Sequence, residues 1–181
     1  RTSGVAVIAN QNGHWNCVAV APSYDAFLSS AKACPVDWIN GRFEGSRADI
    51  PQLLRTAASL AGQTVDLVAI DMPVATFSTR RPADHAISTT FGAQGCSAHS
   101  PSATRPGPLG AELTNQFLEA GFTLVTAGDP LRRTRQLIEA YPHPALLALL
   151  GASYRVPYKV QKSTRYWPGT DTHERTVRLL A

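Results

Sequence analysis

Cysteine, charged residues and long apolar runs are all scarce in the sequence, and each shortage excludes a class of protein. The three cysteines, Cys17, Cys34 and Cys96, are odd in number and form no CxxC or Cys/His cluster, which excludes a disulfide framework and argues against zinc. Charged residues make up 17% of the chain, below the usual figure of about a quarter, so it is not a disordered polyelectrolyte. The longest apolar stretch, residues 145–152, is far too short to cross a bilayer. We therefore expect no membrane span and a location in the reducing cytoplasm.

The chain is long enough for one domain with a substantial core. It has 181 residues, of which 44% are apolar, and a chain of this length buries roughly 70% of the surface that its unfolded form exposes. The sequence does not begin with a basic segment followed by an apolar one, the pattern that is typical of a signal peptide. The first residue is Arg1 rather than Met, so we expect the native N-terminal segment to be missing.

Positive charge is concentrated in the second half of the chain. Lys and Arg number 17 and Asp and Glu number 13, a net charge of +4. Residues 80–181 alone carry 12 basic and 7 acidic groups, or +5. Most of the cations are arginine, whose planar fork suits phosphate oxygens, so a polyanionic partner is one reading. The alternative is that the arginine content reflects base composition in the genome.

The order of elements predicts an α/β protein. An apolar segment, an Asn-Gly turn and a second apolar segment predict an antiparallel hairpin over residues 4–21. Asp49 and Gly62 flank a helical apolar pattern as its start and stop signals. Single apolar strands and helices then alternate, which indicates a mixed sheet flanked by helices. Strands are expected at 66–70, 122–126 and 135–141, and helices at 24–33, 49–61, 81–91, 112–120, 146–150 and 171–180.

Asp71 directly follows a short apolar run that we expect to be a strand buried on both faces. Ligands in open α/β sheets bind at the carboxyl ends of the strands, and Pro73 turns the chain away at that point. Asp71 is therefore either a site residue or the cap of the following turn.

A second candidate carboxylate, Glu139, lies in the predicted strand over residues 135–141. Burying a glutamate on a sheet is costly unless it meets a cation or metal, whereas on an edge strand it would simply face solvent. His143 stands between Pro142 and Pro144, where it is either a ligand or base or a hydrogen-bonded residue of a rigid turn.

Cations form a third group. Arg80 and Arg81 begin a predicted helix, where their charge opposes the helix dipole, which favours a carboxylate or phosphate partner over a role in helix stability. Lys159, Lys162 and Arg165 follow in a polar connection, and we expect them to lie in the same region of space as Arg80 and Arg81. A plain surface location is the alternative for the whole group.

Taken together, these segments resemble the DUF429 family, whose members are predicted RNase H-like nucleases. The matching pieces run in family order over most of the chain from residue 4 to about 178: IDMP (70–73), RRPAD (80–84), AHSPSATRPG (98–107), EAYPHPAL (139–146), YK (158–159) and STRYWP (163–168).

The resemblance implies a single RNase H-like domain over residues 1–181, with an antiparallel hairpin leading into a mixed sheet flanked by helices. It also implies a metal-dependent nuclease that hydrolyses nucleic-acid phosphodiesters with Mg²⁺ or Mn²⁺. Asp71 and Glu139 would be metal ligands and, with Lys159, catalytic residues. The substrate-binding residues would be Arg80, Arg81, His143, Lys162 and Arg165.

The sequence departs from the pattern at both ends. The first-strand Asp of RNase H-like sites and a carboxylate on a last helix are not found, so we expect both terminal segments to be missing. Alternatives are a non-catalytic nucleic-acid or protein binding module on the same fold and, less favoured, a nucleotide-dependent phosphotransferase, whose glycine-rich phosphate loop is not seen.

Overall fold

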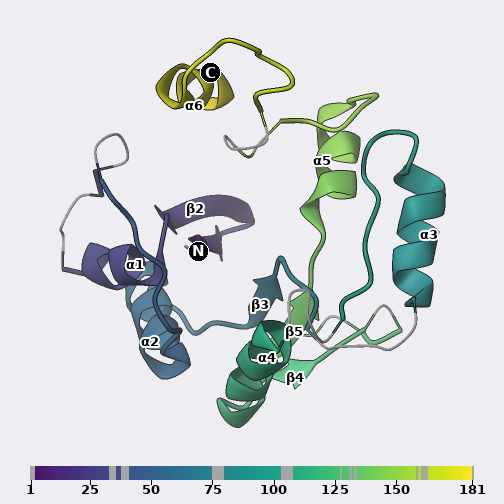
Figure 1. The fold of residues 1–181 in the computed structure, drawn as a ribbon. Helices are drawn as coiled ribbons and strands as arrows, with labels where there is room; N and C mark the ends of the chain where they lie inside the picture. Colours follow the sequence, from purple (N-terminus) through teal and green to yellow (C-terminus); the bar gives the residue numbers. More distant parts are fainter. Residues whose placement is uncertain are drawn as a thin grey trace. The chain divides into compact units, whose positions relative to one another are not determined.

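The computed structural model describes residues 3–32, 36–37, 41–74, 80–102, 108–126, 128–130, 132, 134–157, 159 and 163–180, and its elements are labelled in Figure 1. Backbone contacts divide the chain into two compact units, each described by itself below. The first unit comprises Arg1–Ile70 and Leu109–Glu139, and the second comprises Asp71–Pro108 and Ala140–Ala181.

The first unit begins with the predicted antiparallel hairpin. Strand β1 (Val5–Gln11) pairs with β2 (His14–Ala21) across a turn in which Asn12 and Gly13 have φ angles of 54° and 86°. An Asn-Gly pair adopts these left-handed angles at little cost. The turn is also held by the Asn10 side chain, which accepts a hydrogen bond from the Gly13 amide at 3.0 Å.

Two capped helices pack on the hairpin and on each other. Helix α1 (Tyr24–Ser30) is capped by Ser23, and α2 (Ile50–Ala61) is capped by Asp49, which accepts from the Gln52 amide at 2.9 Å. The predicted start and stop of α2 are thus confirmed, including the left-handed Gly62 at its end. The helices bury Phe27 and Ile50 almost completely, which stabilises the fold by about 1.5–3 kcal/mol per side chain.

The second sheet of this unit is parallel. Strand β5 (Gln136–Glu139) lies between β3 (Leu67–Ile70) and β4 (Thr123–Leu124), and helix α4 (Leu109–Glu119) packs against β4. Leu137, in the central strand, is fully buried. The α/β class with an N-terminal hairpin is confirmed, but the antiparallel and parallel pairings form two separate sheets in the described residues rather than one mixed sheet.

Two expectations for the parallel sheet were wrong in detail. Strand β3 is not buried on both faces: Ile70 is buried, but Leu67 is 44% exposed. The reason is its place at one edge of the three-stranded sheet, where β5 is its one partner among the described residues. Strand β4 is shorter than predicted, because Phe122 leaves the ladder and packs edge-on against Phe117 with ring centroids 5.7 Å apart.

The described part of the second unit holds three helices, α3 (Pro82–Phe91), α5 (Pro142–Leu150) and α6 (Thr172–Leu180). Helix α5 begins four residues earlier than predicted, because Pro142 occupies its first position, where a missing N–H costs nothing. Helix α6 is capped by Asp171, whose side chain accepts from the Glu174 amide at 2.7 Å. No helix among the described residues is long and apolar enough to cross a membrane.

Candidate functional site

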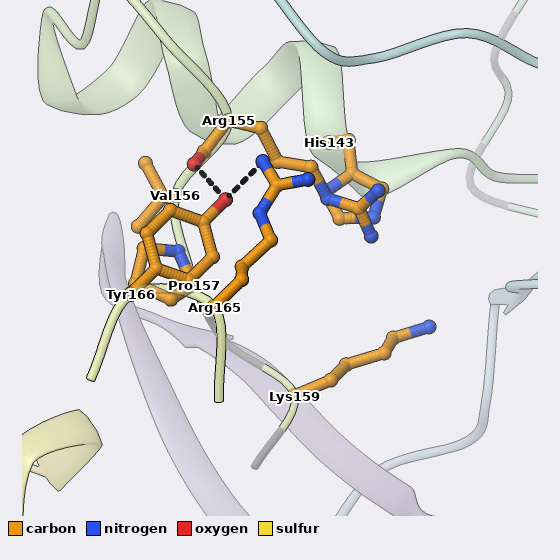
Figure 2. Close-up of a pocket in the computed structure, with 7 residues that line it drawn as sticks. All are labelled: His143, Arg155, Val156, Pro157, Lys159, Arg165 and Tyr166. Atoms are coloured by element: carbon orange, nitrogen blue, oxygen red, sulfur yellow. Dashed lines mark hydrogen bonds between the residues drawn. The ribbon is translucent and has the colours of Figure 1, made fainter. Parts of the chain in front are cut away.

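The second unit contains a pocket of about 290 Å³ whose described lining is mostly basic and aromatic. The lining residues, drawn in Figure 2, are His143, Arg155, Val156, Pro157, Lys159, Arg165 and Tyr166. They come from the first turn of α5, the chain that follows this helix, and the turn over residues 163–169 that precedes α6. Segments separated by more than 20 residues in the sequence therefore share one cavity.

Helix α5 fixes the position of His143. This residue occupies the second position of the helix, between two prolines in its first turn, and only 5% of its surface is exposed. Its ring meets the Tyr141 ring edge-on, with centroids 5.3 Å apart. The Tyr141 hydroxyl in turn donates to the Ser97 carbonyl at 3.1 Å. The imidazole therefore has one fixed orientation at the pocket wall.

Two tyrosines hold the guanidinium of Arg165. Its Nη2 donates to the Tyr154 hydroxyl at 3.1 Å and to the Tyr166 hydroxyl at 3.0 Å. Its Cζ also lies 4.7 Å from the Tyr166 ring centroid, within cation–π range. The Tyr166 hydroxyl then donates to the Arg155 carbonyl at 2.9 Å, so the two dashed lines in Figure 2 meet at this oxygen.

The electrostatics of the pocket favour an anion. Arg155, Lys159 and Arg165 bring three positive charges, and no carboxylate is among the described lining residues. Hydrogen bonds to the hydroxyls of Tyr154 and Tyr166 raise the pKa of Arg165 above its ordinary value, so its charge is constant at any physiological pH. One carboxylate, that of Asp71, approaches the group, with its Oδ2 3.6 Å from Lys159 Nζ.

A glycine turn supports the wall behind Arg155. The Arg155 amide donates to the Gln94 carbonyl at 2.8 Å. The next residue, Gly95, has a φ of 79°, and a Cβ there would stand 2.8 Å from Tyr154 Cζ. Only a residue without a side chain allows this approach of the turn to the Tyr154 ring.

Four of the predicted site residues are brought together. His143, Lys159 and Arg165 line one pocket, and Asp71 joins them through Lys159; Arg80 and Arg81 are not among the described lining residues. Lys162 lies outside the described residues. Glu139 ends β5 in the first unit, where it is half-buried and pairs in register with Ile70, the residue before Asp71. The roles assigned to these side chains stay predictions.

The two arginines at the start of α3 have different environments. Arg81 donates from Nε and Nη2 to both oxygens of Asp84, at 2.7 and 2.8 Å, and Asp84 also accepts from the Ser100 hydroxyl at 2.6 Å. The carboxylate partner considered from the sequence is thus the chain's own Asp84, which is almost fully buried. Hydrogen bonding to Arg81 holds the pKa of Asp84 below its usual range. Arg80, by contrast, is exposed.

The described residues do not assemble a metal centre. They contain no group of three or more His, Cys, Asp or Glu side chains placed to hold an ion. Asp71 is instead paired with the ammonium group of Lys159. Of the cysteines, Cys17 and Cys96 are free thiols, Cys17 exposed and Cys96 buried.

Neither Arg155 nor Tyr154 was among the residues predicted for the site. The signal was present in the form of two dipeptides of the same composition, Tyr154-Arg155 and Arg165-Tyr166. They are ten residues apart and meet through the hydrogen bonds described above. Pairs of aromatic and arginine residues are typical of surfaces that bind nucleic acid.

Comparison with known proteins gives one result for the whole chain. The profile of a family described as "Protein of unknown function (DUF429)" matches residues 1–181. No curated protein matches the chain, and no solved structure does.

Proposed function

We propose that this chain, which belongs to the DUF429 family, is a nuclease that holds the backbone phosphates of a nucleic acid in the pocket of its second unit. The observation that carries the proposal is the convergence of Arg155, Lys159 and Arg165 on one cavity. Three cations around a small volume repel one another, and an anion between them removes that repulsion.

The lining side chains fit a phosphate in particular. Each guanidinium offers parallel N–H donors at the spacing of two phosphate oxygens, and Lys159 adds a mobile point charge. Arg165 is already oriented by its two tyrosine hydroxyls, so binding would cost it little conformational entropy. His143 adds a ring nitrogen at the wall of the same cavity.

The cleavage part of the proposal rests on the resemblance to RNase H-like nucleases. Hydrolysis forms a bond from a water oxygen to phosphorus and breaks the bond from phosphorus to the leaving oxygen. Water loses a proton and the leaving oxygen gains one. Asp71 and Glu139 are the carboxylates proposed to serve this reaction. In the first unit, the register of β3 with β5 sets Glu139 beside Ile70, the residue that precedes Asp71 in the chain.

Mg²⁺ or Mn²⁺ is the cofactor that the resemblance implies. These ions prefer hard oxygen ligands such as carboxylates. The described residues do not yet fit such an ion, since they supply no set of three ligands and Asp71 is paired with Lys159. No step of the reaction is therefore assigned to a metal.

The Asp71–Lys159 pair favours a second candidate function. A carboxylate neutralised by an ammonium group is a poor metal ligand, which is what a binding module that does not cleave would show. In that case the pocket would hold nucleic acid through the same cations without hydrolysis.

Binding and cleavage assays on pocket variants test the two candidates together. Lys159→Ala should weaken binding and reduce the slope of log K against log salt by about 0.7–0.9, the loss of one phosphate contact. The matched control is Lys32→Ala, an exposed lysine at the end of α1 that does not line the pocket.

Cleavage of DNA and RNA is then followed with Mg²⁺, Mn²⁺ and Ca²⁺. Products with Mg²⁺ or Mn²⁺ but not with Ca²⁺ support the nuclease, because Ca²⁺ coordinates more loosely. Binding without products supports the binding module. If Lys159→Ala and Lys32→Ala bind equally well, both candidates are wrong.

A further inference from the structure

The size of the pocket restricts what can enter it. Its volume of about 290 Å³ lies at the lower limit of small-molecule sites, roughly 300–1,000 Å³. A volume of this order accommodates part of one nucleotide. A duplex is too wide to enter such a volume, because its major groove alone is about 12 Å wide. It could therefore present only its outer phosphates to the pocket.

An exposed aromatic ring stands next to the pocket. Tyr154 is 47% exposed, so it is not part of the hydrophobic core. One side of its ring meets the Arg165 guanidinium, with Cζ 5.5 Å from the centroid. A Cβ at Gly95 would stand 2.8 Å from its Cζ and 2.9 Å from its Oη, so the Gly95 turn packs closely against the hydroxyl end of the ring. Tyr154 therefore contacts this turn and Arg165 while the residue as a whole is 47% exposed.

This combination of cations and an exposed aromatic side chain is characteristic of sites for single strands. Proteins that bind single-stranded nucleic acid follow the backbone with positive charges and stack unpaired bases on aromatic rings and guanidinium planes. A base in a duplex already stacks on its neighbours and cannot use such a ring without being extruded. The cations alone would not distinguish the two forms.

We infer that the pocket takes a single-stranded polynucleotide, with a backbone phosphate among Arg155, Lys159 and Arg165 and an unpaired base stacked on Tyr154. The inference rests on the proposed function and adds the class of substrate. It makes Tyr154 a binding residue that contacts the base, and Arg165 a residue that serves both the phosphate and the stacked base.

The test is fluorescence anisotropy with labelled oligonucleotides of about 12 nucleotides, within the site sizes of single-strand binding proteins. Oligo(dT) and oligo(U) represent single strands, and a duplex of equal length is the comparison. We expect both single strands to bind more tightly than the duplex. Tyr154→Ala should lower single-strand affinity about fivefold or more and leave the duplex nearly unchanged.

Two further variants make the result specific. Tyr154→Phe keeps the ring and removes one of the two hydroxyls that orient Arg165, so it should lose less single-strand affinity than Tyr154→Ala. Trp15→Ala removes another exposed aromatic ring, on β2, which is 73% exposed and does not line the pocket. It should have no effect on affinity. Urea denaturation of each variant confirms that the fold is retained.

The inference is overturned if the duplex binds as tightly as the single strands. It is also overturned if Tyr154→Ala binds like wild type while Lys159→Ala is weakened. Either result would leave the phosphate pocket and the proposed function standing. Competition by thymidine monophosphate as strong as that of oligo(dT) would overturn the polynucleotide assignment. Failure of every oligonucleotide to bind would overturn the proposed function itself.

Discussion

The ammonium group of Lys159 lies 3.6 Å from a carboxylate oxygen of Asp71. Both side chains are nearly half exposed, so the pair contributes at most about 1 kcal/mol to folding. Its importance is chemical, because it joins the strongest sequence candidate for a catalytic acid to a lysine of the cationic pocket. The carboxylate lowers the positive charge that an incoming phosphate would meet.

Asp71→Asn should separate binding from cleavage. The substitution keeps the shape of the side chain and removes its charge, so Lys159 no longer shares its charge with a carboxylate. We expect affinity for a single-stranded oligonucleotide to rise by up to about fivefold, the equivalent of an exposed ion pair. Cleavage should be lost, because the proposed catalytic carboxylate is gone. Anisotropy and product analysis by gel electrophoresis measure the two effects.

Asp66→Asn is the matched control for this variant. Asp66 is an exposed aspartate directly before β3, whereas Asp71 directly follows it. Its substitution should change neither affinity nor cleavage. Wild-type cleavage rates in Asp71→Asn would show that this aspartate has no part in catalysis.

The Arg81–Asp84 pair should matter for stability rather than for substrate binding. Arg81→Ala leaves a buried carboxylate without its bidentate partner, and breaking such a pair costs about 3–5 kcal/mol. Arg80→Ala, at the neighbouring exposed arginine, should cost less than about 0.5 kcal/mol. Urea denaturation at pH 7 gives both values. Equal stabilities of the two variants would contradict a structural role for Arg81.

The same carboxylate predicts an acid dependence of stability. The pKa of Asp84 is lowered in the folded protein, first by the hydrogen bond from Arg81. Folding therefore favours the ionised form. The stabilisation is complete above the unfolded pKa of about 3.9 and is lost as the pH falls through the lower folded value. Asp84→Asn should be less stable than wild type at pH 7, and the difference should shrink below about pH 4.

Local signals predicted the helices well and the strands less well. Asp49 and Gly62 mark the two ends of α2 because caps act through the nearest backbone groups. Pro142 was misleading, since the same proline that ends a strand also suits the first turn of a helix. The separation of the two sheets could not be predicted, because strand pairing depends on partners far away in the sequence.

The candidate site was predictable by residue type but not by partner. His143, Lys159 and Arg165 were identified from their chemistry, and they share the pocket. The sequence gives no indication that Arg81 would be bound by Asp84 rather than left for a substrate, because that depends on Ser100 approaching from a distant loop. Tyr154 was missed for the same reason: its role comes from the approach of Gly95 and Arg165.

The core of the parallel sheet should be centred on β5. Leu137→Ala empties a fully buried site and should cost about 3–5 kcal/mol, and Ile70→Ala about 2–5 kcal/mol. Leu67→Ala, in the same strand as Ile70 but 44% exposed, should cost under about 1.5 kcal/mol. Urea denaturation of the three variants measures these losses of stability and shows their order. A cost at Leu67 as large as that at Leu137 would mean that β3 is not an edge strand.

Gly95→Ala should damage both the fold and the pocket, and Gly151→Ala provides the control. Both glycines have positive φ angles, 79° and 59°, so an alanine at either position is strained by about 1–2 kcal/mol. At Gly151 a Cβ meets nothing within 4 Å, whereas at Gly95 it would stand 2.8 Å from Tyr154 Cζ and 2.9 Å from its Oη. The backbone strain is therefore shared, and only Gly95→Ala also displaces the tyrosine ring.

We accordingly expect Gly95→Ala to lower single-strand affinity about as much as Tyr154→Ala, and Gly151→Ala to leave it unchanged. The double variant Gly95→Ala/Tyr154→Ala identifies the cause. With the ring removed, the closest contact of the added methyl group is Arg155 Cβ at 3.3 Å, which a small shift relieves, so the double variant should bind little more weakly than Tyr154→Ala alone. If the two losses of affinity add instead, Gly95 acts on the pocket by a route other than Tyr154, and the ring is not held as the structure indicates.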